Sequence, residues 1–183
     1  QSGLGLPDRD YYLLDKPDFA DARTKYIAHI AAMLKLAGRD APEARAKAVF
    51  ALEHGLAAAQ WSKVALRDPV KTYNPRTPEA LATEAPGLDW AAFLAEAGVG
   101  GEKKLIVGQP SAVTDMAKLV AGTPIAVWRD YLLMRTLDAR ASVLPAAFVA
   151  EDFAFNGTVL AGTPKQRERW KRGVDATNGA MGE

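Results

Sequence analysis

The amino-acid sequence predicts an all-α fold, an irregular arrangement of about seven or eight helices with at most one short strand. Apolar residues recur at steps of three and four over most of the chain, which is the period of an amphipathic helix. Signals that begin helices, such as Thr-Pro pairs, stand between these stretches. Only residues 104–107 have the pattern of a strand. With 183 residues, 49% hydrophobic and 25% charged, we expect one domain over 1–183, in which 1–17 is a lead-in segment and 18–183 is helical.

Two long helices are predicted in the first third of the chain. The first covers about 18–37 and ends at Gly38, because glycine favours the backbone conformation that closes a helix. The second covers about 41–65 and begins at Asp40-Ala41-Pro42-Glu43, which offers a cap and a proline in the first turn. We expect an antiparallel pair. The apolar faces are Phe19, Ala22, Tyr26, Ile30, Met33 and Leu34, and then Ala48, Val49, Leu52, Leu56 and Ala59.

The middle of the chain is predicted as short helices between turns. Residues 67–76 contain two prolines and show no period, so we expect a loop. Thr77-Pro78-Glu79 begins a short helix, and Leu88-Asp89-Trp90 begins another that ends near Gly98. After the predicted strand, Ser111 is expected to cap a helix that continues to about residue 120.

Three more helices are predicted in the last third. Thr123-Pro124 begins one that runs to about residue 142. Leu144-Pro145 begins the next, which we expect to end before Asn156-Gly157. Thr163-Pro164-Lys165-Gln166 has the pattern of a capping box and is expected to open a final helix through Trp170 and Val174.

Composition excludes several classes of function. The net charge of +1 is too small to indicate a nucleic-acid partner or an anionic membrane surface. No apolar run approaches the roughly 20 residues that a membrane span requires. The absence of cysteine excludes disulfides, thiolate zinc sites and cysteine nucleophiles. The chain begins with Gln1 and carries no secretion signal, so we expect any signal of the parent protein to lie upstream.

The two histidines do not form a recognisable zinc motif. A helical His-Glu-x-x-His places two imidazoles one turn apart with a glutamate between them. Glu53-His54 lies on a predicted helix, but Ala58 stands four residues after His54, and Phe50 stands where the inverted motif needs histidine. His29 lies on another helix. His29 and His54 could still converge in space with a carboxylate, but we expect two ordinary helical histidines.

Other candidate groups are also better explained by structure than by chemistry. Ser62 and Ser111 stand near predicted helix ends, and no Gly-x-Ser-x-Gly elbow is present. The basic run 165–172 could face an acidic partner, but we expect an amphipathic helix that buries Trp170, with Glu168 paired to Arg172. The four tryptophans, Trp61, Trp90, Trp128 and Trp170, are expected to pack in the core with their indole N–H groups hydrogen-bonded.

Many short stretches, in a shared order and spacing, resemble the neprilysin-like zinc metallopeptidases. The opening Gly3-Leu4-Gly5-Leu6-Pro7-Asp8-Arg9-Asp10-Tyr11-Tyr12 is similar to the segment before the helical domain of that family. The remaining matches are 49–53, 59–62, 67–69, 73–74, 89–90, 93–94, 106–110, 128–132, 144–145, 153–157, 162, 169–172 and 178–179. The lack of cysteine resembles the bacterial branch rather than the disulfide-bonded animal members.

The resemblance implies a two-domain zinc endopeptidase whose motif-bearing, thermolysin-like catalytic domain would follow Glu183. The present chain resembles much of the helical cap over the active-site cavity, which admits small peptides and excludes folded proteins. The implied parent uses zinc, is exported to the periplasm or cell surface, and contacts this chain through the catalytic domain of the same polypeptide. We assign no catalytic or metal-binding residue within 1–183, expect no cofactor in this segment, and leave the substrate-contacting residues unassigned.

Two other interpretations stay open. A free-standing helical interaction module could descend from the same cap without a peptidase half, and the sequence after Glu183 would separate the two. An unrelated helical adaptor with a basic last helix is disfavoured by the ordered matches. If the chain is a cap, it should expose an apolar patch when isolated, and we expect weak self-association.

Overall fold

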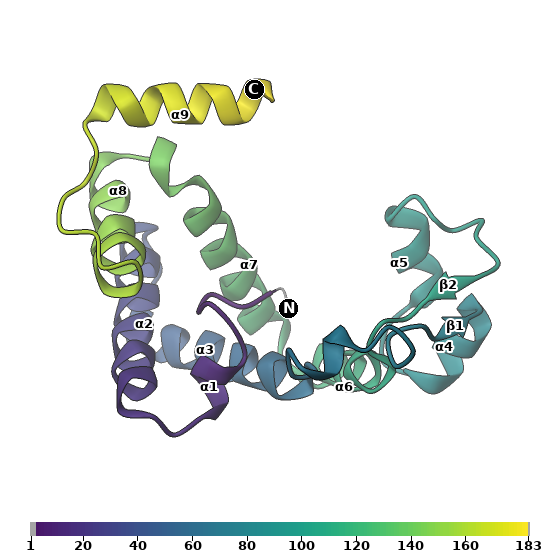
Figure 1. The fold of residues 1–183 in the computed structure, drawn as a ribbon. Coiled ribbons are helices and arrows are strands. Elements are labelled where there is room, and N and C mark those ends of the chain that lie inside the picture. The colour runs from purple at the N-terminus through teal and green to yellow at the C-terminus, as the bar shows by residue number, and fades with distance from the viewer. Residues whose placement is uncertain (1–2, 183) are drawn as a thin grey trace. The chain divides into compact units, whose positions relative to one another are not determined.

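The computed structural model describes residues 3–182 as a set of helices with one very small sheet, which confirms the predicted all-α class (Figure 1). The described chain contains nine α-helices, two 3₁₀ turns, one π-helical segment and two strands of two residues each. In chain order these are α1 Asp10–Leu13, α2 Pro17–Leu36, α3 Pro42–Ala59, η1 Ala65–Arg67, β1 Pro75–Arg76, α4 Pro78–Glu84, α5 Trp90–Glu96, β2 Leu105–Ile106, α6 Pro110–Gly122, α7 Ile125–Arg140, η2 Ala141–Val143, α8 Ala146–Asp152, η3 Phe153–Leu160 and α9 Arg169–Met181.

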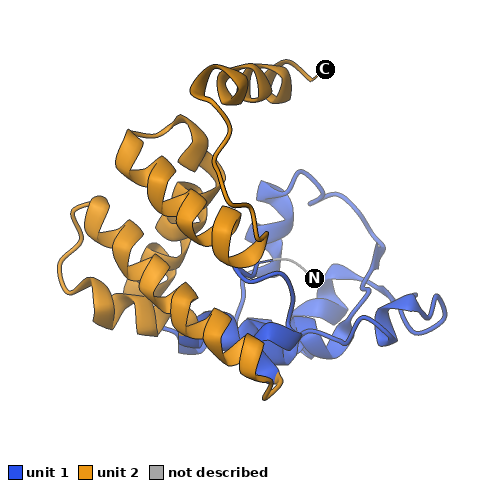
Figure 2. Cartoon of the chain, turned by 60° about the vertical axis from the view of Figure 1, so that its left-hand side comes forward, with its two compact units in different colours: residues 1–13, 51–124 blue, residues 14–50, 125–183 orange. Residues whose placement is uncertain are grey.

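The chain divides into two compact units, each assembled from two separate stretches of sequence. Unit 1 consists of residues 1–13 and 51–124, and unit 2 consists of residues 14–50 and 125–183 (Figure 2). The boundary between them falls inside α3, which contributes residues to both. The predicted single domain over 1–183 stays a prediction.

Unit 2 has its core around α2, whose apolar face was predicted correctly. α2 begins with Pro17 in its first turn and ends at Gly38, whose φ of 72° is the left-handed conformation expected there. Its main packing partners are α7, α8 and η3, so the expected antiparallel pairing with α3 is not the principal contact. The physical reason is that α7 and α8 return from the far end of the chain to cover this face. The fully buried side chains include Tyr26, Ile30, Met33, Leu34 and Met134.

Unit 1 contains the second half of α3, the short helices α4 to α6 and the small sheet. The side chains of Thr77 and Asp89 cap α4 and α5, because each accepts a hydrogen bond from the backbone N–H three residues on. β2 lies within the predicted strand 104–107, and it pairs antiparallel with β1. β1 lies in the segment 67–76 that was predicted as a loop. A strand of two residues is too short to leave a periodic pattern in the sequence.

α3 ends at Ala59, six residues before the predicted boundary, because the backbone amide of Trp61 is bonded outside the helix. The Trp61 N–H donates to Gln109 Oε1 at 2.7 Å, and the Trp61 indole N–H donates to Ser111 Oγ at 2.7 Å. The predicted cap at Ser111 is therefore wrong. Gln109 occupies the cap position of α6 without a side-chain bond, and the Ser111 hydroxyl holds the indole instead.

Two boundaries in the last third also differ from prediction. The helix after Pro145 does not stop before Asn156-Gly157 but continues as the π-helical segment η3. Gly157 is needed inside that segment, because a Cβ built there would lie 2.4 Å from the Phe153 ring. The capping box at 163–166 is wrong as well. Thr163 N–H donates to Gly157 O at 2.8 Å, and α9 begins only at Arg169.

Within residues 3–182, no single helix combines the length and apolar character needed to cross a bilayer. One pair of helical stretches, Ile125–Val143 with Ala146–Leu160, passes that length and composition criterion jointly but is bent by 106°.

Candidate functional site

The histidines of the described chain, 3–182, do not form a zinc site. Among residues 3–182, no three His, Asp or Glu side chains converge in a way that could hold a metal ion. His29 belongs to unit 2 and His54 to unit 1, and His54 is exposed on α3. Both ring nitrogens of His29 already face carboxylates of the same unit. We therefore derive no zinc chemistry from these side chains.

His29 is the centre of a buried charged cluster that sequence analysis missed. Its side chain is 1% exposed on α2. Nδ1 lies 3.0 Å from Glu151 Oε1 on α8, and Nε2 lies 3.2 Å from Asp138 Oδ1 on α7. Burial lowers the pKa of His29, but the hydrogen bonds to Asp138 and Glu151 outweigh it, so the net shift of the pKa is upward. The sequence held no local signal for this cluster, because the partners lie more than 100 positions away.

A second buried cluster fastens the opening segment to α3 in unit 1. Glu53 is fully buried and accepts a hydrogen bond from the Tyr12 hydroxyl at 2.7 Å. The same hydroxyl accepts the backbone N–H of Leu6 at 3.0 Å and of Gly5 at 3.1 Å. Burial, and then the charge of Glu53, raise the pKa of Tyr12 well above its ordinary value, so Tyr12 is a neutral donor. Glu53 is thus an anchor for the lead-in segment rather than part of a zinc motif.

A third cluster joins the start of α3 to α7 in unit 2. Asp130 is 4% exposed on α7. Its two carboxylate oxygens accept from Arg39 at 3.1 Å and from Arg45 at 2.8 Å. Two guanidinium groups on one buried carboxylate satisfy its charge and fix the turn between α2 and α3 against α7.

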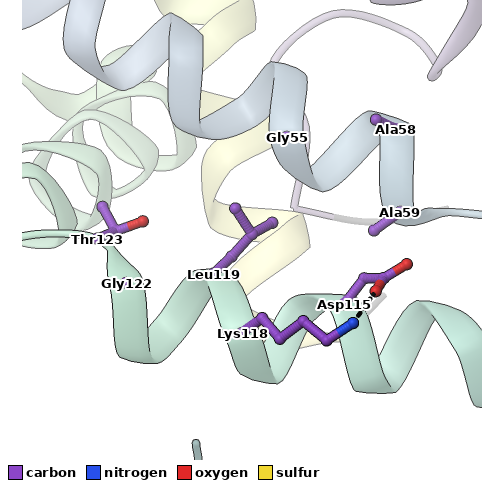
Figure 3. Close-up of a pocket in the computed structure, with 8 residues that line it drawn as sticks. All are labelled: Gly55, Ala58, Ala59, Asp115, Lys118, Leu119, Gly122 and Thr123. Atoms are coloured by element: carbon purple, nitrogen blue, oxygen red, sulfur yellow. Dashed lines mark hydrogen bonds and ion pairs between the residues drawn. The ribbon is translucent and has the colours of Figure 1, made fainter.

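An open, largely apolar groove lies between α3 and α6 in unit 1. Small residues line the α3 side, namely Gly55, Ala58 and Ala59 (Figure 3). Leu119 points across from α6, and a Cβ added to Gly55 would lie 3.1 Å from its side chain. Asp115 and Lys118 form an ion pair of 2.9 Å along the rim. Close helix packing accounts for these small residues, and the two charged side chains on the groove are paired with each other.

The basic run near the C-terminus differs from its prediction. Trp170 is 65% exposed rather than buried, and its indole N–H donates to Glu168 Oε2 at 2.8 Å. Glu168 pairs with Lys171 at 3.5 Å and not with Arg172, because Glu168 stands before the first residue of α9 rather than one turn inside it. Val174 and Met181 lie on the same side of α9 as Trp170 and are also exposed.

The other three tryptophans follow the prediction in part. Trp61 and Trp90 donate their indole N–H groups, to Ser111 Oγ and to Ala85 O respectively. The indole nitrogen of Trp128 is buried without a hydrogen-bond partner among residues 3–182, although its ring packs edge-on against Tyr131.

Comparison with known proteins identifies what this arrangement of helices is. The family model for the N-terminal part of peptidase family M13 matches residues 1–183. The chain belongs to peptidase family M13. Neprilysin-2 of Drosophila melanogaster is 29% identical over 189 residues, and endothelin-converting enzyme 1 of Mus musculus is 28% identical over 190 residues. Each alignment covers 100% of this chain and 24% of the relative. The predicted neprilysin-like family is thereby confirmed.

Solved M13 structures have the same fold over the full length of the chain. The zinc metalloprotease Zmp1 of Mycobacterium tuberculosis, in an open state, matches with a TM-score of 0.88 and 37% identity. The same protein in complex with an inhibitor matches with a TM-score of 0.89. These alignments cover 100% of this chain and 28–29% of the solved chains. The present chain therefore spans about a quarter of the length of the relatives and less than a third of the solved chains, and its helices correspond to the N-terminal helical part of M13 peptidases.

Proposed function

We propose that this chain is the non-catalytic helical portion of an exported zinc metalloendopeptidase. In this proposal it restricts access to the active-site cavity, so that small peptides enter and folded proteins do not. The observation that supports it is the match of the M13 N-terminal family model to all 183 residues, in relatives about four times as long. The matching solved structures are those of a zinc metalloprotease. Zinc and the catalytic residues would belong to the part of the parent polypeptide that follows this segment.

Physical features of the chain agree with a domain that works against another surface. Large apolar side chains stand exposed along one face of α9, with Trp170 at 65%, Val174 at 49% and Met181 at 70%. An exposed apolar face of this kind usually marks a surface that binds another protein or domain. We propose that this neighbour is the catalytic domain of the same polypeptide. The isolated 183-residue chain should then associate weakly with itself, which light scattering over a range of protein concentrations would detect.

The first test compares the isolated chain with the full-length parent protein. We expect the 183-residue chain to be free of stoichiometric zinc and inactive on short fluorogenic peptides, and the parent to bind zinc and cleave them. Zinc content is measured by mass spectrometry after dialysis against a weak chelator, and activity with and without added zinc. A fragment that binds zinc and cleaves would refute the proposal. A parent gene without His-Glu-x-x-His after Glu183 would instead favour the free-standing interaction module.

The access-restricting role requires a second test on the parent. One cleavable peptide is presented free, within longer flexible peptides and inside a loop of a folded, stable protein. A cap that selects by size predicts a decline in kcat/KM with length and no cleavage of the folded carrier. Equal cleavage of the peptide in all three forms would contradict the access-restricting role. It would not contradict the proposal that this chain is part of a peptidase.

A further inference from the structure

The His29 cluster connects three helical segments of unit 2 through one buried ring. Glu151, on the Nδ1 side, belongs to α8, and Asp138, on the Nε2 side, belongs to α7. The ring is 1% exposed, whereas the side chains of Asp138 and Glu151 are 16% and 29% exposed. One imidazole on α2 therefore contacts side chains of two other helices.

The geometry of this cluster requires a particular protonation state. A carboxylate only accepts hydrogen bonds, and a neutral imidazole carries a single N–H donor. With carboxylate oxygens 3.0 Å and 3.2 Å from its two nitrogens, His29 satisfies both only as the doubly protonated imidazolium. Loss of one proton would turn a nitrogen lone pair toward a carboxylate, and one of the two contacts would become repulsive.

The same ring also supports the unusual helical segment η3. The His29 ring stacks on Phe155 at 4.7 Å between centroids with an interplanar angle of 17°. Tyr26 lies on the same aromatic cluster, 5.4 Å from Phe155. A cation against an aromatic face is attracted by the ring electrons, so the charge on His29 favours this stack. π-helical turns are rare in proteins, and η3 packs on α2 through this aromatic cluster.

The charged groups around the cluster favour the proton. On α7, Asp138 is paired both with His29 and with Arg135, at 3.7 Å from the guanidinium. On α8, Glu151 is the facing group, while its neighbour Asp152 accepts from Asn156 Nδ2. The segment η3 contains no ionisable side chain. On α2 itself, Lys25 is paired with Asp21 at 2.6 Å. The carboxylates of Asp138 and Glu151 are accompanied by one arginine, Arg135, so the net charge of these groups is negative. This negative charge favours the protonated form of His29.

We propose that His29 is a proton-operated latch that holds α8 and η3 against α2 and α7 when the imidazole is charged and loosens them when it is neutral. The latch acts within unit 2, and its chemistry is independent of whether the parent is a peptidase. The segment released on deprotonation is Ala146–Leu160.

The direction of the pH effect follows from linkage. Because the pKa of His29 is raised in the folded chain, its stabilisation is complete below the ordinary histidine value of about 6.5. It is lost as the pH rises through the raised value. The latch is therefore closed in mildly acidic conditions and opens on the alkaline side.

The chain offers a direct test because it contains only two histidines. Imidazole NMR signals of the 183-residue chain are followed between acidic and alkaline pH, with His54→Gln used to assign the signals of His29. Backbone hydrogen exchange, corrected for its intrinsic pH dependence, is measured at the same time. We expect His29 to titrate above the histidine reference value. We also expect protection in 146–160 to fall severalfold with the same midpoint, while protection in α6 of unit 1 does not change.

Variants separate the latch from a general loss of stability. Glu151→Gln removes one carboxylate with little change of shape and should shift both midpoints downward together. Asp21→Asn, an exposed α2 carboxylate that does not face His29, is the matched control and should shift neither. His29→Gln should remove the pH dependence of protection in 146–160.

Two results would overturn the proposal even if His29→Gln does not fold. One is a wild-type His29 that titrates at or below the reference value. The other is a His29 that titrates as expected while protection in 146–160 stays constant across the transition.

Discussion

The Tyr12–Glu53 contact supports a quantitative prediction for the substitution Tyr12→Phe. The change removes one oxygen atom from a side chain that is 3% exposed and leaves the ring packing intact. That oxygen donates to Glu53 Oε2 at 2.7 Å and accepts the Leu6 N–H at 3.0 Å. Both partners are buried, so water does not replace the lost hydroxyl without opening the structure.

The expected cost follows from these two bonds, because the Gly5 N–H, which the hydroxyl also accepts, is only partly buried and lies within 3.4 Å of Glu53 Oε2 as well. A hydrogen bond to a buried charged group contributes about 1.5–3 kcal/mol, and a buried backbone N–H left without its acceptor costs about 1 kcal/mol. We therefore expect the free energy of opening the lead-in segment to fall by about 3 kcal/mol, which is roughly a hundredfold in the opening equilibrium. Because the contact lies within unit 1, the effect should concentrate there.

Hydrogen exchange of residues 5–12 in wild-type and Tyr12→Phe chains measures this change. Tyr73→Phe is the control, because Tyr73 is 58% exposed. The control should stay within about 0.5 kcal/mol of wild type. A loss below about 0.5 kcal/mol in Tyr12→Phe would refute the reasoning, since it would show that the hydroxyl does not anchor the segment. Because burial and the charge of Glu53 raise the pKa of Tyr12, wild-type protection should also decline as the pH rises above the ordinary tyrosine value of about 10.

Three further predictions concern packing and helix geometry, each measured by urea unfolding. Met134→Ala should lower the free energy of unfolding by about 2–5 kcal/mol, because Met134 is fully buried. Leu132→Ala, at a position 59% exposed on the same helix, should lower it by less than about 1 kcal/mol. Equal losses in the two variants would contradict the assigned face of α7. Gly157→Ala should destabilise unit 2, because its Cβ would overlap a phenylalanine ring at 2.4 Å. Gly179→Ala, with open space around it on α9, should stabilise the chain by up to about 1 kcal/mol. Stabilisation by both substitutions would rule out the tight packing inside η3. Thr77→Ala should cost about 1 kcal/mol through loss of the α4 cap, and an unchanged stability would show that this cap is not needed.

Local patterns predicted the helices well where the local signal was also the deciding one. Gly38 ends α2 as expected, because a left-handed residue is needed at that position and only glycine adopts it at little cost. Thr77 and Asp89 cap their helices as expected, because a cap is a contact across three residues of chain. The apolar face of α2 was also correct, since its period is a property of that helix alone.

The predictions failed where contacts in the folded chain differ from the local interaction that the sequence pattern indicated. Ser111 was expected to cap α6, but its hydroxyl accepts from the indole of Trp61, 50 positions earlier. Asn156-Gly157 has the composition of a helix stop, but Gly157 instead makes room for the Phe153 ring within a π-helical segment. Trp170 was expected in the core of an amphipathic helix, and it is exposed because the described chain places no apolar partner over that face of α9.

For the candidate site, too, local sequence patterns predicted some features and the folded structure decided others. The absence of a zinc motif could be read directly from the sequence, since the motif is defined by spacing along one helix. The role of each histidine could not. His29 and His54 have the same residue type and similar helical surroundings, yet one is buried between two carboxylates and the other is exposed.

By itself, the sequence determined the all-α class, the M13 family and most helix starts, because these depend on periodicity, caps and ordered motifs within short stretches of chain. Only the tertiary structure decided which of two histidines is buried between two carboxylates, which carboxylate anchors the opening segment and which helices cover α2. These outcomes depend on groups brought together from 41 to 122 positions apart. Electrostatic and hydrogen-bond energies depend on the distance between groups in space, not on their separation along the chain. The pattern of neighbouring residues therefore does not predict these long-range contacts.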